Sequence, residues 1–117
     1  MDESILNSIK KLLGISDLDG SFDADIIMNI NTVFGILWQI GVGPKVPFRI
    51  TGPIETWKDF LDDISRIEFI KSYMHLRVAQ LFDPAANGAI DESRNNLIKE
   101  LEWRLYISSE NETLKSD

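Results

Sequence analysis

DADIIMNINTVFGILWQIGVGP, residues 23–44, is the segment that decides the fold expected for this chain. Its apolar residues recur at alternating intervals of four and three, which places them on one face of a helix. A second apolar row beside this face makes the apolar surface wider than one neighbouring helix covers. The first row is Ile26, Ile30, Val33, Leu37 and Ile40, and the second is Ile27, Phe34 and Trp38. We therefore expect a central helix with the rest of the chain packed around it.

Both ends of this helix carry recognisable signals. At its start, Ser21 or Asp23 can accept hydrogen bonds from the free backbone N–H groups of the first turn. At its end, Gly41 and Gly43 allow a left-handed turn, and Pro44 prevents the helix from continuing. These signals fix the helix boundaries within a few residues.

Composition limits the kind of protein. The chain has 117 residues, enough for one domain, with 44% hydrophobic and 26% charged residues, as in ordinary globular proteins. The central segment approaches the length of a membrane span, but Asn29, Asn31 and Gln39 argue against one, so we expect no membrane association. The net charge of −7 disfavours direct binding of nucleic acid. There is no cysteine, and the first residues lack the basic region of a secretion signal.

Three further helices are expected, over residues 1–15, 66–83 and 90–107. In the first, Lys10 and Lys11 are placed on the solvent side. Together they predict a single helical domain over residues 1–107, followed by a polar tail, residues 108–117, that stays flexible unless bound. The core-facing residues are Ile5, Ile9 and Leu12 in the first, Ile67, Ile70, Met74, Val78 and Leu81 in the second, and Leu97, Ile98, Leu101 and Leu105 in the third.

Residues 45–56 do not form a helix, because Pro47, Gly52 and Pro53 interrupt them. The run from Phe48 to Thr51 favours extended structure, so we expect a short β-hairpin or an extended loop. Thr56 and Asp59 then resemble a capping box at the start of a one- or two-turn helix. The predicted fold class is all-α: a small bundle of about four to five helices with that hairpin or loop after the central helix.

The residues that carry catalysis or bind metals do not form a recognisable site. The acidic run that begins at Asp17 has Phe22 where a calcium loop needs Gly and Met28 where it needs Glu. His75 is the only histidine and has no cysteine or second histidine to complete a zinc site. The carboxylates of residues 59, 62 and 63 are interpreted as an acidic solvated face. We therefore expect no enzyme, no metal site and no cofactor.

The last helix carries apolar residues on two faces. Trp103, Tyr106 and Ile107 lie on the side opposite Leu101, which belongs to the core row. Two interpretations stay open: a loop of the same chain covers Trp103, or this face is a subunit interface.

Four blocks of sequence follow one another along most of the chain, up to about Leu105. The blocks are KKLLGI with the acidic turn and central helix, FRITGPIETWKDFL, IEFIKSYMHLRVAQLFDP, and IKELEWRL. No single block is a mechanistic motif, and FRI followed by TWKDF and LFDP is the most distinctive part. Taken in order, these blocks resemble the small head-tail connector proteins of tailed bacteriophages, also called adaptor or head-completion proteins.

The resemblance implies a virion protein of the neck, made in the host cytoplasm, that forms a dodecameric ring below the portal protein. Such a ring extends the channel for genomic DNA and supports a stopper or tail-completion protein. The competing interpretation is a small acidic helical module that acts as a dimer. The candidate interface residues for subunits or partners are Trp38, Phe48, Arg49, Ile50, Trp103, Tyr106 and Ile107.

Overall fold

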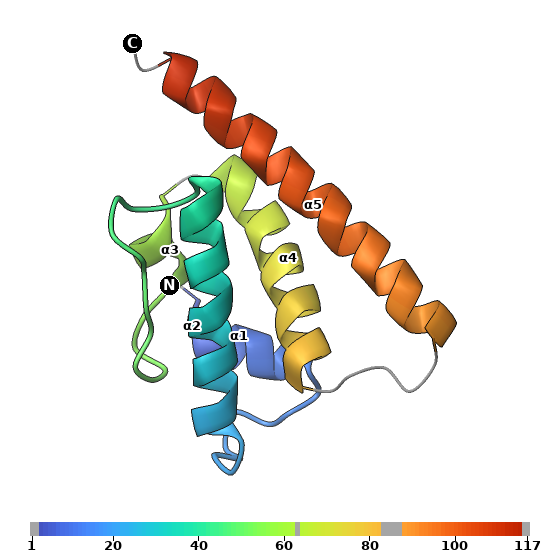
Figure 1. The fold of residues 1–117 in the computed structure, drawn as a ribbon. Coiled ribbons are helices and arrows are strands. Elements are labelled where there is room, and N and C mark those ends of the chain that lie inside the picture. The colour runs from blue at the N-terminus through green and yellow to red at the C-terminus, as the bar shows by residue number, and fades with distance from the viewer. Residues whose placement is uncertain (1–2, 63, 83–87, 116–117) are drawn as a thin grey trace.

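A computed structural model describes residues 3–62, 64–82 and 88–115, and these residues form an all-α bundle of five helices (Figure 1). The central helix α2 packs against α1, α4 and α5, and α4 packs against α5. The predicted fold class is therefore confirmed in its helical part. The helices are α1 (Ile5–Leu12), α2 (Asp23–Ile40), α3 (Trp57–Phe60), α4 (Ile64–Phe82) and α5 (Gly88–Lys115).

The first apolar row of α2 supplies the middle of the core. Ile26, Ile30, Val33 and Leu37 are fully buried, as the spacing predicts, and Phe34 of the second row is buried beside them. The helix ends at Gly41, whose φ of 96° is left-handed, and the Leu37 carbonyl accepts hydrogen bonds from the N–H groups of residues 41 and 42. No helix in the described residues is long and apolar enough to cross a membrane.

The prediction that Lys10 faces solvent is wrong. Its side chain is 1% exposed, and its ammonium group pairs with the Asp23 carboxylate at 2.8 Å. The same group donates hydrogen bonds to the backbone carbonyls of Asp17 at 3.4 Å and Asp19 at 2.8 Å. Asp23 therefore neutralises a buried cation instead of capping α2, which has no side-chain cap at Phe22. The acidic turn before α2 folds around Lys10.

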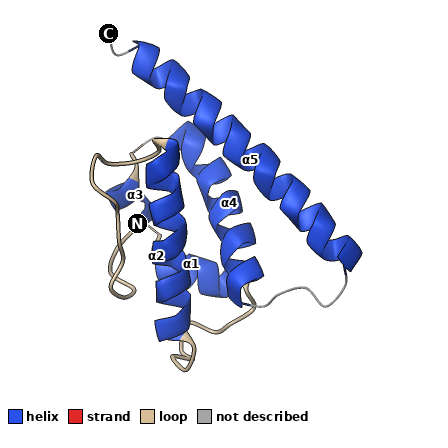
Figure 2. Cartoon of the chain, in the orientation of Figure 1, coloured by secondary structure: helices blue, strands red, loops and turns tan. Residues whose placement is uncertain are grey.

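No hairpin forms in the described residues after α2; residues 41–56 adopt the extended loop that was its alternative (Figure 2). Asn31 of α2 holds this loop with two hydrogen bonds to one residue. The Ile50 N–H donates to Asn31 Oδ1 at 2.8 Å, and Asn31 Nδ2 donates to the Ile50 carbonyl at 3.0 Å. A side-chain amide thus replaces the partner strand, which explains how a loop rich in proline stays ordered against a helix.

An aromatic cluster joins the loop to the short helix α3. Phe34, Phe48 and Phe60 have ring centroids 4.7–5.4 Å apart, and Trp57 lies beside Phe34. Helix α3 begins with the predicted capping box, in which Thr56 and Asp59 bond to each other's backbone N–H groups. The cluster fixes the position of the loop over one side of α2.

The outer helices differ from expectation at three core positions and one boundary. The predicted core residues Leu12 of α1, Leu81 of α4 and Leu97 of α5 are each about half exposed. Helix α5 continues to Lys115 instead of ending near Ile107, and Ser109 donates a hydrogen bond from Oγ to the Gly41 carbonyl at 2.8 Å. The flexibility of residues 108–117 when unbound stays a prediction, and the predicted end of α4 at residues 83–84 lies outside the described residues.

Candidate interaction surfaces

The outward side of α5 carries an aromatic ridge, which we define as Trp103, Tyr106 and Ile107. These side chains are 62%, 42% and 37% exposed. The Trp103 and Tyr106 rings stack with centroids 6.1 Å apart and planes 27° apart. Such exposure shows that no described loop covers Trp103. An exposed cluster of large aromatic residues is typical of a protein-protein contact.

The ridge is held outward because the opposite side of α5 is fixed to α4. Ile98, Leu101 and Leu105 are buried against the core. Beside them, Glu102 Oε2 accepts hydrogen bonds from the Tyr73 hydroxyl and from Arg77 Nη2, both at 3.1 Å. Burial is the main cause that raises the pKa of Tyr73 to about 12. The phenol is therefore a neutral donor near neutral pH, and the contact sets the rotation of α5.

A second outward surface is a groove between α2 and the loop, with a volume of about 510 Å³. We call it the α2 groove. The α2 residues that line it are turned away from the core row, and the loop closes one side. Its lining comprises Ala24, Ile27, Met28, Asn31, Thr32 and Gly35 from α2 and Pro47, Phe48 and Arg49 from the loop.

The predicted loop residues have different positions. Ile50 is 1% exposed and belongs to the core, whereas Phe48 is half-buried and its ring packs on Phe34 and Phe60. Arg49 is exposed at the rim of the α2 groove. Of the three, Arg49 presents its side chain most openly to a partner.

Trp38 is neither fully exposed nor fully covered. Its side chain is 45% exposed, and its indole N–H donates a hydrogen bond to the Lys45 carbonyl at 2.8 Å. This bond ties the end of α2 to the start of the loop. Nearly half of the Trp38 side chain therefore stays accessible at the end of α2, whereas the aromatic ridge belongs to α5.

The sequence reasoning missed the α2 residues of the groove. Met28 is 62% exposed, and Gly35 lies in the middle of an 18-residue helix. The glycine itself is a signal in the sequence, because glycine inside a helix destabilises the helix relative to alanine. Only the structure shows that no neighbouring atom of the described chain would contact a Cβ at this position.

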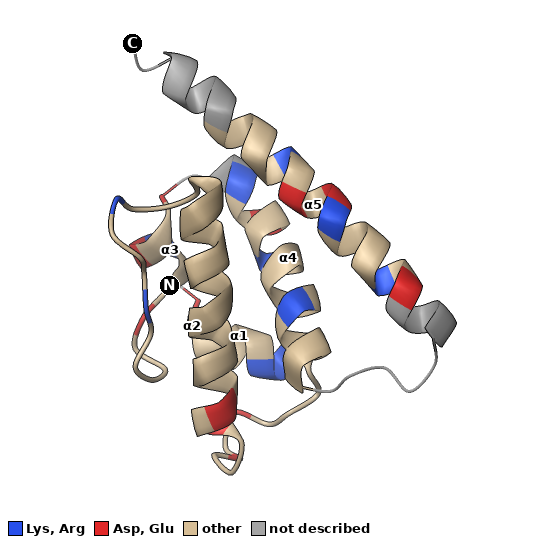
Figure 3. Cartoon of the chain, viewed as in Figure 1, with Lys and Arg blue, Asp and Glu red and all other residues tan. Residues whose placement is uncertain are grey.

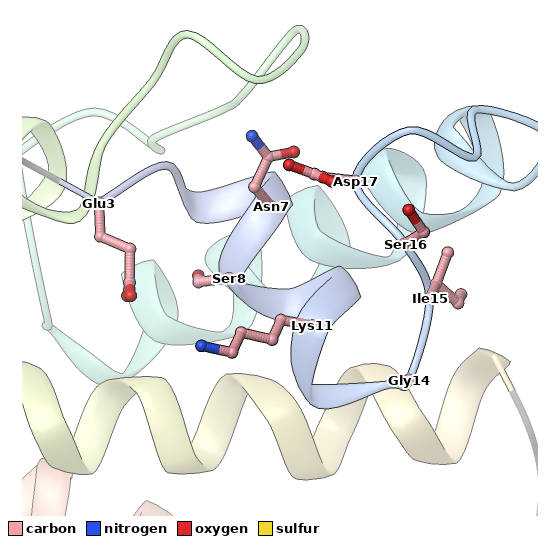
Figure 4. Close-up of a pocket in the computed structure, with 8 residues that line it drawn as sticks. All are labelled: Glu3, Asn7, Ser8, Lys11, Gly14, Ile15, Ser16 and Asp17. Atoms are coloured by element: carbon pink, nitrogen blue, oxygen red, sulfur yellow. The ribbon is translucent and has the colours of Figure 1, made fainter.

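A third hollow of about 480 Å³ lies along α1 (Figure 4). Its lining combines Glu3, Lys11 and Asp17 with Asn7, Ser8 and Ser16. In the described part of the chain, no three His, Cys, Asp or Glu residues gather so that they could hold a metal ion.

The described residues thus form an all-α bundle with an exposed aromatic ridge and a groove on its surface. In the comparison with family models, the phage connector protein family matches residues 5–112, which is nearly the whole chain. The chain belongs to the phage connector protein family. Comparison with curated proteins and with solved structures found no significant match. Membership in this family gives the chain a structural role at the head-tail junction in the neck of a phage virion.

Proposed function

We propose that the protein is an adaptor that assembles as a ring, twelvefold in the virion, below the portal protein. In this role the ring extends the DNA channel, joins the capsid to the tail, and carries a stopper or tail-completion protein on its far side. The observation that carries the proposal is the aromatic ridge, since a family member with three exposed apolar side chains on its longest helix is suited to bind another subunit.

A ring also requires two different patches on each subunit, because head-to-tail contacts join unlike surfaces. The ridge on α5 and the α2 groove are such unlike surfaces. Charged residues on α2 are confined to its first turn, at Asp23 and Asp25 (Figure 3). The rest of this helix is suited to packing against protein.

The acidic character of the chain is compatible with passage of genomic DNA. At a net charge of −7, phosphate groups are repelled on average, so DNA can slide without sequence-specific binding. We place the end of α5 against the portal and the loop around Arg49 against a neighbouring subunit or the tail side. In Figure 1 the C-terminal end of α5 projects beyond the other helices, where a neighbouring ring can reach it.

Replacing Trp103 with alanine tests the ridge. Because Trp103 is mostly exposed, Trp103→Ala should weaken ring assembly and leave the melting temperature of the isolated subunit nearly unchanged. Leu101→Ala is the matched control, since Leu101 is 7% exposed on the same helix and its loss should cost about 2–5 kcal/mol of stability. Electron microscopy and thermal melting measure the two effects. A Trp103→Ala variant that assembles normally but melts earlier contradicts an interface role.

A truncation tests the contact with the portal. Removing residues 111–117 keeps Ser109 and its bond to Gly41, so the bundle should stay folded. Retention of this variant on DNA-filled heads should fall if the end of α5 meets the portal. Full retention contradicts that contact, and a stable dimer in place of any ring favours a small acidic helical module instead.

A further inference from the structure

Gly35 lies where nothing in the described chain requires a glycine. A Cβ atom added to it meets no other atom within 4 Å, and its φ is not positive. Glycine inside a helix lowers helix stability relative to alanine. By contrast, Gly41 and Gly43 both have positive φ, and a Cβ at either lies 2.6 Å from another side chain. The space above Gly35 is therefore open in the isolated subunit, and a second chain can approach the α2 backbone closely at this position.

We infer that the α2 groove receives the aromatic ridge of a second copy of this chain. This pairing rests on the proposed function, because it names the two surfaces that meet between adjacent subunits of the ring. Gly35 is one of the residues that line the groove, whereas the ridge carries two stacked and exposed rings. Trp103 and Tyr106 are the side chains that enter it.

The positions of the two surfaces on one subunit fit a head-to-tail contact. In Figure 1 the loop flanks one side of α2, while α4 and α5 lie on the other side. The groove faces the loop side, and the ridge faces away from the core on α5. A subunit can thus present its ridge to one neighbour and its groove to another, as a closed ring requires.

Size and charge also fit a second copy. A groove of about 510 Å³ lies within the roughly 300–1,000 Å³ range of pockets that enclose compact ligands, so it has room for aromatic side chains. Arg49 at its rim has no carboxylate partner among the described residues. Glu100, three residues before Trp103, places an exposed carboxylate beside the ridge, where Arg104 already pairs with it at 2.9 Å. Arg49 can join this pair when the ridge enters the groove.

Cross-linking tests the pairing directly, because the natural chain has no cysteine. Met28→Cys places a thiol in the groove, and Ile107→Cys places one on the ridge, leaving Gly35 and Trp103 intact. Assembled on portal-bearing heads and treated with a short bis-maleimide, the double variant should give a ladder of linked subunits. Each single variant should give none. Rings without a ladder overturn the pairing and leave the proposed ring intact, whereas absence of any ring overturns both.

Filling the groove provides an independent test. Gly35→Trp should fold normally, because its Cβ has open space, and should lose ring assembly. Ser72→Trp is the matched control, since Ser72 is exposed on α4 outside both surfaces, and it should assemble as the natural chain does. If Gly35→Trp melts early, Thr32→Trp replaces it at an exposed position in the same groove. Normal assembly of a folded groove variant overturns the inference.

Discussion

Lys10 is the residue that most changes how the N-terminal half is understood. Its ammonium group links α1 to two carbonyls of the acidic turn and to the Asp23 carboxylate at the start of α2. A helical pattern cannot reveal such a residue, because its periodicity records polarity and not the burial of a long side chain with a polar tip.

Lys10→Met tests this role. The methionine keeps the apolar stem but removes the hydrogen-bond donor for two carbonyls and the ion-pair partner of Asp23. The free energy of unfolding should therefore fall by about 2 kcal/mol. Chemical denaturation followed by circular dichroism measures the change. Lys11→Met, at the exposed neighbouring position, should stay within about 0.5 kcal/mol of the natural chain. Equal losses in both variants contradict a special role for Lys10.

His75 gives the molecule a predictable response to acid. Burial lowers the pKa of His75 below 6.5, a hydrogen bond with the Leu12 backbone opposes this, and repulsion from Arg94 adds to it. The unfolded chain therefore takes up this proton at higher pH than the folded chain. Stability from this group is present above about pH 6.5 and is lost as the pH falls toward the folded pKa.

The measurement follows the single histidine by NMR and compares the free energy of unfolding at about pH 7.5 and about pH 5. His75→Gln, which does not titrate, should show a smaller loss of stability between these values than the natural chain. A folded pKa at or above 6.5 for the imidazole contradicts the expected direction.

The loop of residues 41–56 depends on α2. The two hydrogen bonds between Asn31 and Ile50 satisfy backbone groups of a residue that is 1% exposed. From the sequence alone, Asn31 is recognisable only as a polar residue that is unfavourable in a membrane. Its role requires knowing which backbone lies beside it, and that contact spans nineteen residues.

Asn31→Ala leaves the Ile50 N–H and carbonyl groups without their partner, and the expected cost is about 1–3 kcal/mol. Hydrogen exchange of the Ile50 amide should also become faster. Asn29→Ala is the matched control on the same helix, because no side-chain hydrogen bond involves Asn29 in the described residues, and it should have little effect. Unchanged exchange at Ile50 in the Asn31 variant contradicts the account.

The helices were predictable from the sequence because apolar spacing and glycine signals act locally. The core row of α2, its end at Gly41 and the capping box at Thr56 are all confirmed. Features that depend on distant contacts were not predictable. One such feature is the continuation of α5 past Ile107, where Ser109 donates a hydrogen bond to the Gly41 carbonyl. Another is the buried Ile50, whose backbone is hydrogen-bonded to the side chain of Asn31. The ridge was predictable as an apolar second face, but the groove required the loop in place.

The described chain combines a buried apolar interior with two unlike outward surfaces. The buried residues of α5 lie on its Leu101 side, whereas Trp103, Tyr106 and Ile107 keep 62%, 42% and 37% of their surface exposed on the isolated subunit. Exposed aromatic area is favourable to bury and unfavourable to leave in water. This distribution is expected of a subunit whose final state is an assembly.

A ring of this protein at the portal vertex can be observed by electron microscopy of DNA-filled heads that lack the connector, before and after the purified protein is added. We expect an added ring with twelvefold symmetry on the portal vertex, absent when Trp103→Ala is supplied at the same concentration. Heads that gain no density while the protein remains a stable dimer in solution would contradict it.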